Sequence, residues 1–209
     1  MKKLQKYQKH NKAIYNVISE NATVLDVGCW TGSLGKELIR KKHCIVDGID
    51  VEKKALVIAR KHGYREVWER DLNNRKTLAI PLKKYDYIIF ADVLEHVLYP
   101  KDMLQFYARY LKKDGYIVLS LPNIGFLLYR IQHLFGKFDY EETGIMDTTH
   151  VRFYTLKTMK TLIKESGFAI QKTIRYSDVT LKFAFIRLLK ELFPTLFTLQ
   201  FVFLLKRRS

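Results

Sequence analysis

Short apolar runs alternate along the chain with longer segments in which apolar residues recur every three or four positions. The runs are rich in Val, Ile, Tyr and Phe, which is typical of buried strands. Seven strands are predicted, over residues 23–27, 44–49, 67–70, 87–91, 116–121, 168–174 and 198–205. Helices are predicted over residues 3–19, 33–41, 52–61, 101–111, 124–135, 156–166 and 181–193. Because strands and helices alternate strictly, we expect a parallel sheet that is covered by helices on both faces.

Turn residues and the absence of linkers indicate one domain. Pro100 stands where the first turn of a helix tolerates proline, and Lys113-Asp114-Gly115 predicts a turn before the fifth strand. No repeat and no linker rich in Gly, Pro or Ser divides the sequence. We predict a single domain over residues 1–209, with an N-terminal helix over 3–19, a lid insertion over 124–154 and an additional C-terminal helix over 181–193. The apolar helix of the insertion could instead be a core helix packed on the sheet.

Composition limits the class of protein. A chain of 209 residues, of which 48% are hydrophobic, is long enough to bury a core. Its two cysteines, Cys29 and Cys44, make no disulfide framework and fit a reducing compartment. We find neither a signal-peptide pattern nor a charge-free apolar run of about 18 residues. We therefore expect a cytoplasmic protein, and peripheral contact with the inner face of the membrane stays open.

A formal net charge of +16 favours anionic partners such as nucleic acid, anionic lipid or a phosphorylated substrate. A merely lysine-rich surface explains the charge equally well. The basic, aromatic helix at 181–193 could lie on a membrane surface, although packing on the domain or in a homodimer interface is the interpretation that we favour.

The loop after the first strand has the chemistry of a nucleoside site without a phosphate cradle. Gly28 follows the strand and a helix follows Gly32, but Trp30 and Ser33 replace the further glycines of a dinucleotide-binding fingerprint. There is no P-loop sequence either. A ligand that carries a nucleoside but no phosphates suits this loop.

Acidic residues stand where the first three strands are expected to end. Asp26 could accept a hydrogen bond from a loop amide or pair with a ligand ammonium group. Asp50 could take both ribose hydroxyls, and Asp71 could accept from an adenine amino group while Leu72 packs on the ring. Asp26 and Asp50 could each instead cap the following helix, but their ordered spacing favours ligand contact.

These residues together resemble class I S-adenosylmethionine-dependent methyltransferases, and more narrowly the MetW-like/UbiG-like group. The similar segments are Leu25-Asp26-Val27-Gly28-Cys29, Thr31-Gly32, Gly48-Ile49-Asp50, Asp71-Leu72, Asp92-Val93-Leu94-Glu95-His96-Val97 and Leu121-Pro122-Asn123, within residues 20–170. The resemblance implies a Rossmann-like α/β fold with a mostly parallel seven-stranded sheet, an antiparallel last strand and helices on both faces. It also implies S-adenosylmethionine as methyl donor, held by Asp26, Gly28, Cys29, Trp30, Gly32, Asp50, Val51, Asp71, Leu72, Ala91 and Asp92.

Trp30 departs from the family pattern, which often has glycine there. A tryptophan would be strained if this position required a positive φ. We expect instead that the loop tolerates a side chain, and that Trp30 either packs over the mouth of the site or serves as a core aromatic at the entry to the helix.

Three residues are candidates for catalysis. His150 is the preferred base for an oxygen nucleophile, with a hinge or helix-cap role as the alternative, and Arg152 could bind an acidic group on the acceptor. His96 is the second histidine candidate, although we expect it to line the cofactor pocket or cap a loop. Asp92, Glu95 and His96 also resemble a divalent-metal cluster of some ubiquinone-type relatives, but we expect no metal.

We predict methyl transfer to a small-molecule acceptor by O-methylation, the acceptor being a sugar or glycan intermediate or a lipid-linked or quinone-like molecule. The alternatives are an RNA methyltransferase and a non-catalytic MetW-like partner subunit. Nucleic acid is disfavoured, because the slot where amino-directed enzymes carry an Asn/Asp-Pro-Pro-Tyr motif reads Ala91-Asp92-Val93-Leu94.

Overall fold

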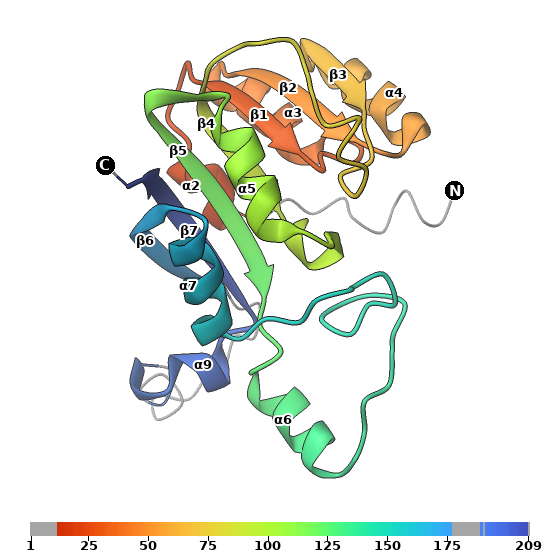
Figure 1. Cartoon of the computed structure of the whole chain (residues 1–209), viewed down its shortest axis with the longest axis vertical. Coiled ribbons are helices and arrows are strands. Elements are labelled where there is room, and N and C mark those ends of the chain that lie inside the picture. Colours follow the sequence, from red (N-terminus) through yellow and green to blue (C-terminus); the bar gives the residue numbers. More distant parts are fainter. Residues whose placement is uncertain (1–11, 177–188, 190, 209) are drawn as a thin grey trace.

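The computed structural model describes residues 12–176, 189 and 191–208. One seven-stranded sheet runs through the molecule in the order β3-β2-β1-β4-β5-β7-β6 (Figure 1). Every neighbouring pair from β3 to β5 is parallel, whereas β7 is antiparallel to both β5 and β6. The strands are β1 (Thr23–Val27), β2 (Ile45–Asp50), β3 (Glu66–Glu69), β4 (Tyr85–Ala91), β5 (Leu111–Pro122), β6 (Phe168–Tyr176) and β7 (Gln200–Arg207).

Helices cover both faces of the sheet, as predicted. α2, α3 and α4 contribute to one hydrophobic core, and α5 and α7 contribute to a second core on the opposite face (Figure 1). The fold therefore confirms the mixed seven-stranded sheet of the Rossmann-like class that the resemblance implies. The helices are α2 (Lys12–Val17), α3 (Ser33–Lys42), α4 (Lys53–Lys61), α5 (Pro100–Ala108), α6 (Leu127–Leu134), α7 (Leu156–Glu165) and α9 (Pro194–Phe197), with a 3-10 turn η1 at Leu94–His96.

The central strands supply both cores because successive side chains point to opposite faces. In β4, Ile88 and Phe90 belong to one core, and Ile89 between them belongs to the other. This double burial explains why these strands read as continuous apolar runs rather than as alternating ones.

The turn predicted at Lys113-Asp114-Gly115 is wrong in detail, because β5 already begins at Leu111. Leu111 pairs with Tyr85 of β4, and the next paired residues are Tyr116 and Tyr87. Four residues of β5 thus face one residue of β4, which is a bulge. The sequence showed the irregularity but not that the strand continues through it.

The N-terminal helix is described only from Lys12, where α2 begins; residues 3–11 of the predicted helix lie outside the described residues. Most of the predicted helix at 181–193 also lies outside them. No helix in the described part of the chain is long and apolar enough to cross a bilayer.

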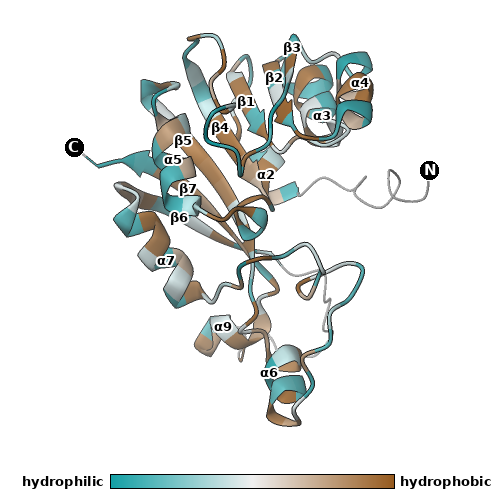
Figure 2. Ribbon diagram, turned by 45° about the vertical axis from the view of Figure 1, so that its right-hand side comes forward, coloured by the Kyte–Doolittle hydropathy of each residue, from teal (hydrophilic) through white to brown (hydrophobic). Residues whose placement is uncertain are grey.

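The insertion places α6 beyond the carboxyl end of β5, away from the sheet in both views (Figures 1 and 2). No residue of α6 is buried, so the core-helix alternative is wrong. Apolar side chains of α6 are instead open to solvent, with Leu134 80% exposed and Leu128 53% exposed.

Candidate active site

The four acids predicted for the site lie at one edge of the sheet. Asp26 lies near the end of β1, Asp50 ends β2, Asp71 follows β3 by two residues, and Asp92 directly follows β4. Because these four strands are parallel neighbours, their carboxyl ends meet. This is the edge where open α/β sheets bind ligands.

The loop between β1 and α3 turns through left-handed conformations. Gly28, Trp30 and Gly32 have φ values of 75°, 49° and 74°. The amides of Gly28 and Cys29 both donate to the Ile49 carbonyl, at 2.7 and 2.9 Å. The loop is thereby fixed against the end of β2.

Trp30 has a positive φ, which is the condition under which a tryptophan at this position is strained. A non-glycine residue in the left-handed region costs roughly 1–2 kcal/mol. The surrounding contacts hold it there, since its amide donates to Asp50 Oδ2 at 2.7 Å. The loop tolerates the side chain, but at a conformational cost.

Asp26 is buried and accepts a hydrogen bond of 2.7 Å from the Tyr64 hydroxyl. Burial raises the pKa of Asp26 to about 6, with Tyr64 opposing the rise and Asp50 adding to it. The carboxyl therefore titrates just below neutral pH.

Asp50 binds two backbone amides, those of Trp30 and Glu52. Burial raises its pKa as well. The helix-capping alternatives are both wrong, because the N-cap residue of α3 is Gly32, with no side-chain cap, and Glu52 caps α4. Within the described part of the chain, neither Asp26 nor Asp50 makes an ion pair with a basic side chain, so both fit a ligand that brings an ammonium group and hydroxyls.

The remaining predicted cofactor residues occupy different environments along this edge. Cys29 is buried, and burial raises the pKa of its thiol. Ala91 ends β4 and is half-buried, and Leu72 packs against the core. Val51 is 62% exposed, and Asp71 is exposed with its carboxylate accepting from a nearby backbone amide. Their contacts with a cofactor stay predictions.

Asp92 is bound by two polar side chains, those of Ser120 and Gln200. Its Oδ1 accepts from the Ser120 hydroxyl at 2.8 Å and from the Gln200 amide. Its own amide donates to Ser120 Oγ at 3.0 Å. The carboxylate is thus occupied by β5 and β7, which does not favour the cluster of Asp92, Glu95 and His96.

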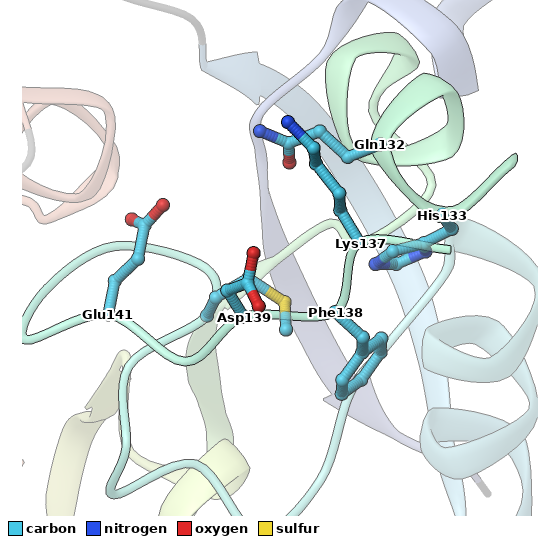
Figure 3. A pocket seen from close by; sticks show the side chains of 7 residues that line it. Gln132, His133, Lys137, Phe138, Asp139 and Glu141 are labelled. Carbon is cyan, nitrogen blue, oxygen red and sulfur yellow. The ribbon is translucent and has the colours of Figure 1, made fainter. Parts of the chain in front are cut away.

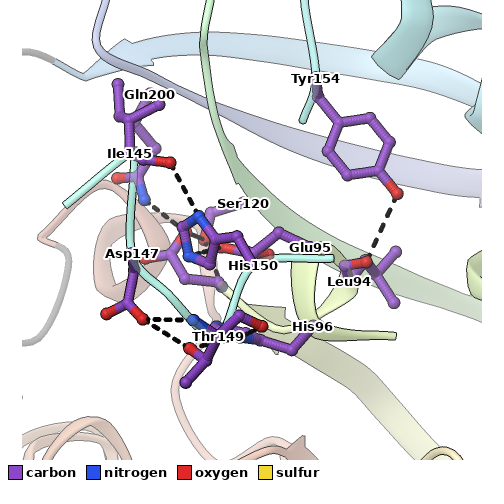
Figure 4. Close-up of polar contacts among 11 residues, drawn as sticks. Leu94, Glu95, His96, Ser120, Ile145, Asp147, Thr149, His150, Tyr154 and Gln200 are labelled. Carbon is purple, nitrogen blue, oxygen red and sulfur yellow. Dashed lines mark hydrogen bonds and ion pairs between the residues drawn. The ribbon is translucent and has the colours of Figure 1, made fainter. Parts of the chain in front are cut away.

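His96 and His150 meet beside Glu95 (Figure 4). The ring centroids are 4.7 Å apart, and Nε2 of His150 lies 4.0 Å from Oε1 of Glu95. Nδ1 of His150 contacts the Ile145 carbonyl at 2.9 Å, and Nδ1 of His96 contacts the Thr149 carbonyl at 3.0 Å. A carbonyl can only accept, so both Nδ1 atoms carry hydrogen and neutral rings would present Nε2 lone pairs.

Burial controls the charge of this group. It raises the pKa of Glu95 well above its usual range, and nearby Asp92 and Asp147 add to the rise. It lowers the pKa of His150. Glu95 is 1% exposed, and its Oε2 has no hydrogen-bond partner among the described residues. Burial thus favours the uncharged forms of both His150 and Glu95.

The same three side chains could hold a metal ion. One ligand atom from each of Glu95, His96 and His150 lies within 4.8 Å of the others. Two imidazoles and a carboxylate suit a divalent transition metal. The candidate group among the described residues thus contains His150 rather than Asp92.

Arg152 fastens the insertion to the loop after β4. Its guanidinium donates to the carbonyls of Val97 and Leu98. The amides of Val151 and Arg152 both donate to the Glu95 carbonyl, at 2.9 and 3.0 Å. The structure thus shows a positioning role for Arg152, and acceptor binding by it stays a prediction.

A hollow within the insertion is too small for an acceptor. Its volume is about 50 Å³, whereas ligand pockets usually exceed roughly 300 Å³. Its lining residues, most of them labelled in Figure 3, are Gln132, His133, Lys137, Phe138, Asp139, Glu141 and Met146.

Tyr64, Ser120 and Gln200 belong to the site region but were not predicted from sequence. Ser120 carried a usable signal, since it is a polar residue within an apolar strand. Tyr64 and Gln200 carried none, because only the fold brings them to Asp26 and Asp92.

The fold and the loop define a class I methyltransferase, the class that uses S-adenosylmethionine as methyl donor. The methyltransferase-domain family model matches residues 4–173, and the chain belongs to that family. The chain is similar to the ubiquinone biosynthesis O-methyltransferase of Glaesserella parasuis serovar 5 (strain SH0165), with 33% identity over 108 residues that cover 48% of this chain and 45% of the relative. The chain therefore spans about half the length of the curated relatives it matches.

Solved structures share the fold. An S-adenosylmethionine-dependent methyltransferase from Mesorhizobium loti superposes with a TM-score of 0.65 at 18% identity, covering 98% of this chain and 100% of that one. The Burkholderia thailandensis 1,6-didemethyltoxoflavin-N1-methyltransferase, solved with bound 1,6-didemethyltoxoflavin and S-adenosylhomocysteine, gives a TM-score of 0.63 at 12% identity, covering 95% of this chain and 76% of that one.

Proposed function

We propose that this protein methylates a hydroxyl oxygen of a small, quinone-like acceptor, using S-adenosylmethionine. The observation that carries the proposal is the His150 imidazole, which is oriented by the Ile145 carbonyl, lies 4.0 Å from Glu95 in the loop after β4, and has its pKa lowered by burial. The relatives that methylate oxygen in ubiquinone biosynthesis support this acceptor class over a sugar.

The cofactor, when bound, supplies an electrophilic methyl group on a sulfonium. The loop from Gly28 to Gly32, with Asp26 and Asp50, would bind its amino acid and ribose ends. These groups would align the methyl carbon with the acceptor oxygen and limit the access of water.

A phenolic hydroxyl, with an ordinary pKa of about 10, must lose its proton as the methyl group arrives. Nε2 of His150 would accept this proton, because Nδ1 is already committed to the Ile145 carbonyl. The resulting imidazolium would lie 4.0 Å from the Glu95 carboxyl group and favour its ionisation.

The insertion supplies an apolar surface on the acceptor side. The exposed side chains of Leu128, Ile131 and Leu134 on α6 lie beyond the carboxyl end of β5. They support an acceptor with an apolar ring or tail, including a lipid-linked one. Homodimer formation and peripheral membrane contact stay separate predictions.

The test is methyl transfer from isotopically labelled S-adenosylmethionine to a panel of catechols, prenylated phenols and sugar hydroxyls, with mass-spectrometric detection. We expect labelled phenol ethers. His150→Gln should lower kcat by about 10²–10⁴-fold while S-adenosylhomocysteine affinity is retained.

His133→Gln on α6 is the matched control and should keep wild-type kcat. Unchanged kcat in His150→Gln would remove the base assignment. Cofactor binding without turnover on any acceptor would favour the non-catalytic partner-subunit alternative, and salt-dependent RNA methylation would favour the nucleic-acid alternative.

A further inference from the structure

Tyr64 reaches the site from the turn after α4 and ends against Asp26. Its side chain is buried, and its hydroxyl donates to Asp26 Oδ2 at 2.7 Å. Burial raises the pKa of Tyr64 well above its usual range, so the hydroxyl keeps its hydrogen at any working pH. Asp26 therefore always faces a donor.

The sequence leaves room for this ring by placing glycines around it. A Cβ atom built on Gly35 would lie 2.2 Å from the Tyr64 hydroxyl oxygen, and one on Gly32 would lie 2.6 Å from the ring. One on Gly48 would lie 2.8 Å from the ring. Three glycines from β2, the cofactor loop and α3 thus form a slot for one tyrosine.

The groups facing Asp26 make this donor important. Among the described residues, Asp50 and the Cys29 thiol are the other titratable groups that influence the carboxyl, and neither brings positive charge. Burial and Asp50 raise the pKa of Asp26, and the hydrogen bond from Tyr64 lowers it. Losing the hydroxyl would leave a buried carboxylate that lacks this donor, which is costly.

We propose that Tyr64 is a positioning residue that holds the Asp26 carboxylate in place for the ammonium group of the cofactor. This inference rests on the proposed role of Asp26 in cofactor binding. It adds a residue that lies outside every motif of the resemblance and does not itself touch the cofactor.

The test compares Tyr64→Phe with the wild-type protein by calorimetric titration with S-adenosylhomocysteine between about pH 5.5 and pH 8. Removing the hydroxyl keeps the ring in its slot and moves the ionisation of Asp26 to higher pH. We expect about tenfold weaker binding near pH 6 and a difference that shrinks toward pH 8. Protonation of the ligand changes with pH but is the same for both proteins. It therefore drops out of the ratio of their affinities at each pH. In steady-state assays, KM for the cofactor should rise more than kcat falls.

Tyr85→Phe is the matched control. The Tyr85 hydroxyl also donates to a buried carboxylate, Asp47 Oδ2, at 2.8 Å. Tyr85, however, stands at the amino end of β4, opposite the carboxyl ends of the strands where the site lies. This variant should bind the ligand like wild type at every pH. An affinity loss in Tyr64→Phe that is equal at all pH values, or no loss, overturns the inference.

The variant Asp26→Asn tests the role of Asp26 separately from that of Tyr64. It also keeps the inference testable if Tyr64→Phe fails to fold. The wild-type protein should bind more tightly as pH rises through about 6, and Asp26→Asn should bind weakly without that rise. Wild-type affinity in Asp26→Asn would overturn the role of Asp26 and with it that of Tyr64, whereas the methylation assay would still report on the proposed reaction.

Discussion

The backbone carbonyl of Glu95 accepts the amide hydrogen of Arg152 at 3.0 Å. This contact joins the loop after β4 to the end of the insertion, more than 50 positions along the chain. The backbone that follows His150 is therefore fixed to Glu95, so the closeness of these two residues does not depend on their side chains alone.

Removing the Arg152 guanidinium should loosen this junction. In Arg152→Ala, the amides of residues 147–153 should exchange hydrogen about tenfold faster or more, since two hydrogen bonds are lost. Hydrogen exchange with mass spectrometry measures this. Arg109→Ala is the control, because Arg109 donates only locally, to Phe106. Equal exchange in both variants would contradict the positioning role of Arg152.

Gly28 should not tolerate a side chain. Its φ is 75°, and an added Cβ would lie 2.5 Å from Val93 Cγ2. Gly28→Ala should lower the free energy of unfolding by roughly 2–4 kcal/mol. Urea denaturation of a double-mutant cycle with Val93→Ala checks the cause, because relief of the clash makes the double variant more stable than the sum of the single effects. Strict additivity would show that the contact with Val93 is not responsible.

Two variants of Trp30 separate its ring from its backbone. Trp30→Ala removes the indole but keeps a Cβ at φ 49°, whereas Trp30→Gly removes both. The glycine variant should be more stable than the alanine variant by about 1 kcal/mol, after allowing for the flexibility of glycine in the unfolded chain. Thermal unfolding of the pair measures the difference. An alanine variant that is the more stable of the two would rule out strain at this position.

The raised pKa of Asp26 should make stability depend on pH. The folded protein binds this proton up to about pH 6, and the unfolded chain releases it near 3.8. Its contribution to the free energy of unfolding therefore falls as pH rises from about 4 to 6 and is then constant. Asp26→Asn should be the more stable protein at pH 7, by up to about 3 kcal/mol, with the gain absent below pH 4. Denaturant titrations at both pH values provide the measurement, and an equal gain at both would exclude the ionisation of Asp26 as its source.

The sheet and its functional edge could be predicted because local patterns determine them. Strands such as β1 and β4 are buried on both faces, so their apolar runs are unmistakable. An acid or a glycine stands at the end of each of these apolar runs. Because the strands pair in parallel, these residues lie together at the carboxyl ends of the strands. The placement of Asp26, Asp50 and Asp92 followed from chain order alone.

The contacts within the site could not be predicted, because they depend on tertiary distances. Tyr64 and Asp26 are 38 residues apart in the sequence. His150 lies beside Glu95 only because the end of the insertion packs against the loop after β4. From the sequence, a positive φ at Trp30 was considered as a source of strain but was not expected. It is stabilised by Asp50 from another strand, which no local propensity describes.

The position of β7 has a consequence for synthesis. β7 follows β6 in the chain, yet it lies between β5 and β6, so within the described part of the chain β6 pairs only with residues of β7. During synthesis, the half of the sheet that carries Gly28 and Asp50 could fold before β7 has been made, while β6 is still unpaired. A premature stop shortly before Gln200 would leave that half intact and expose an edge of β5, which is a route to aggregation rather than to a simple loss of activity.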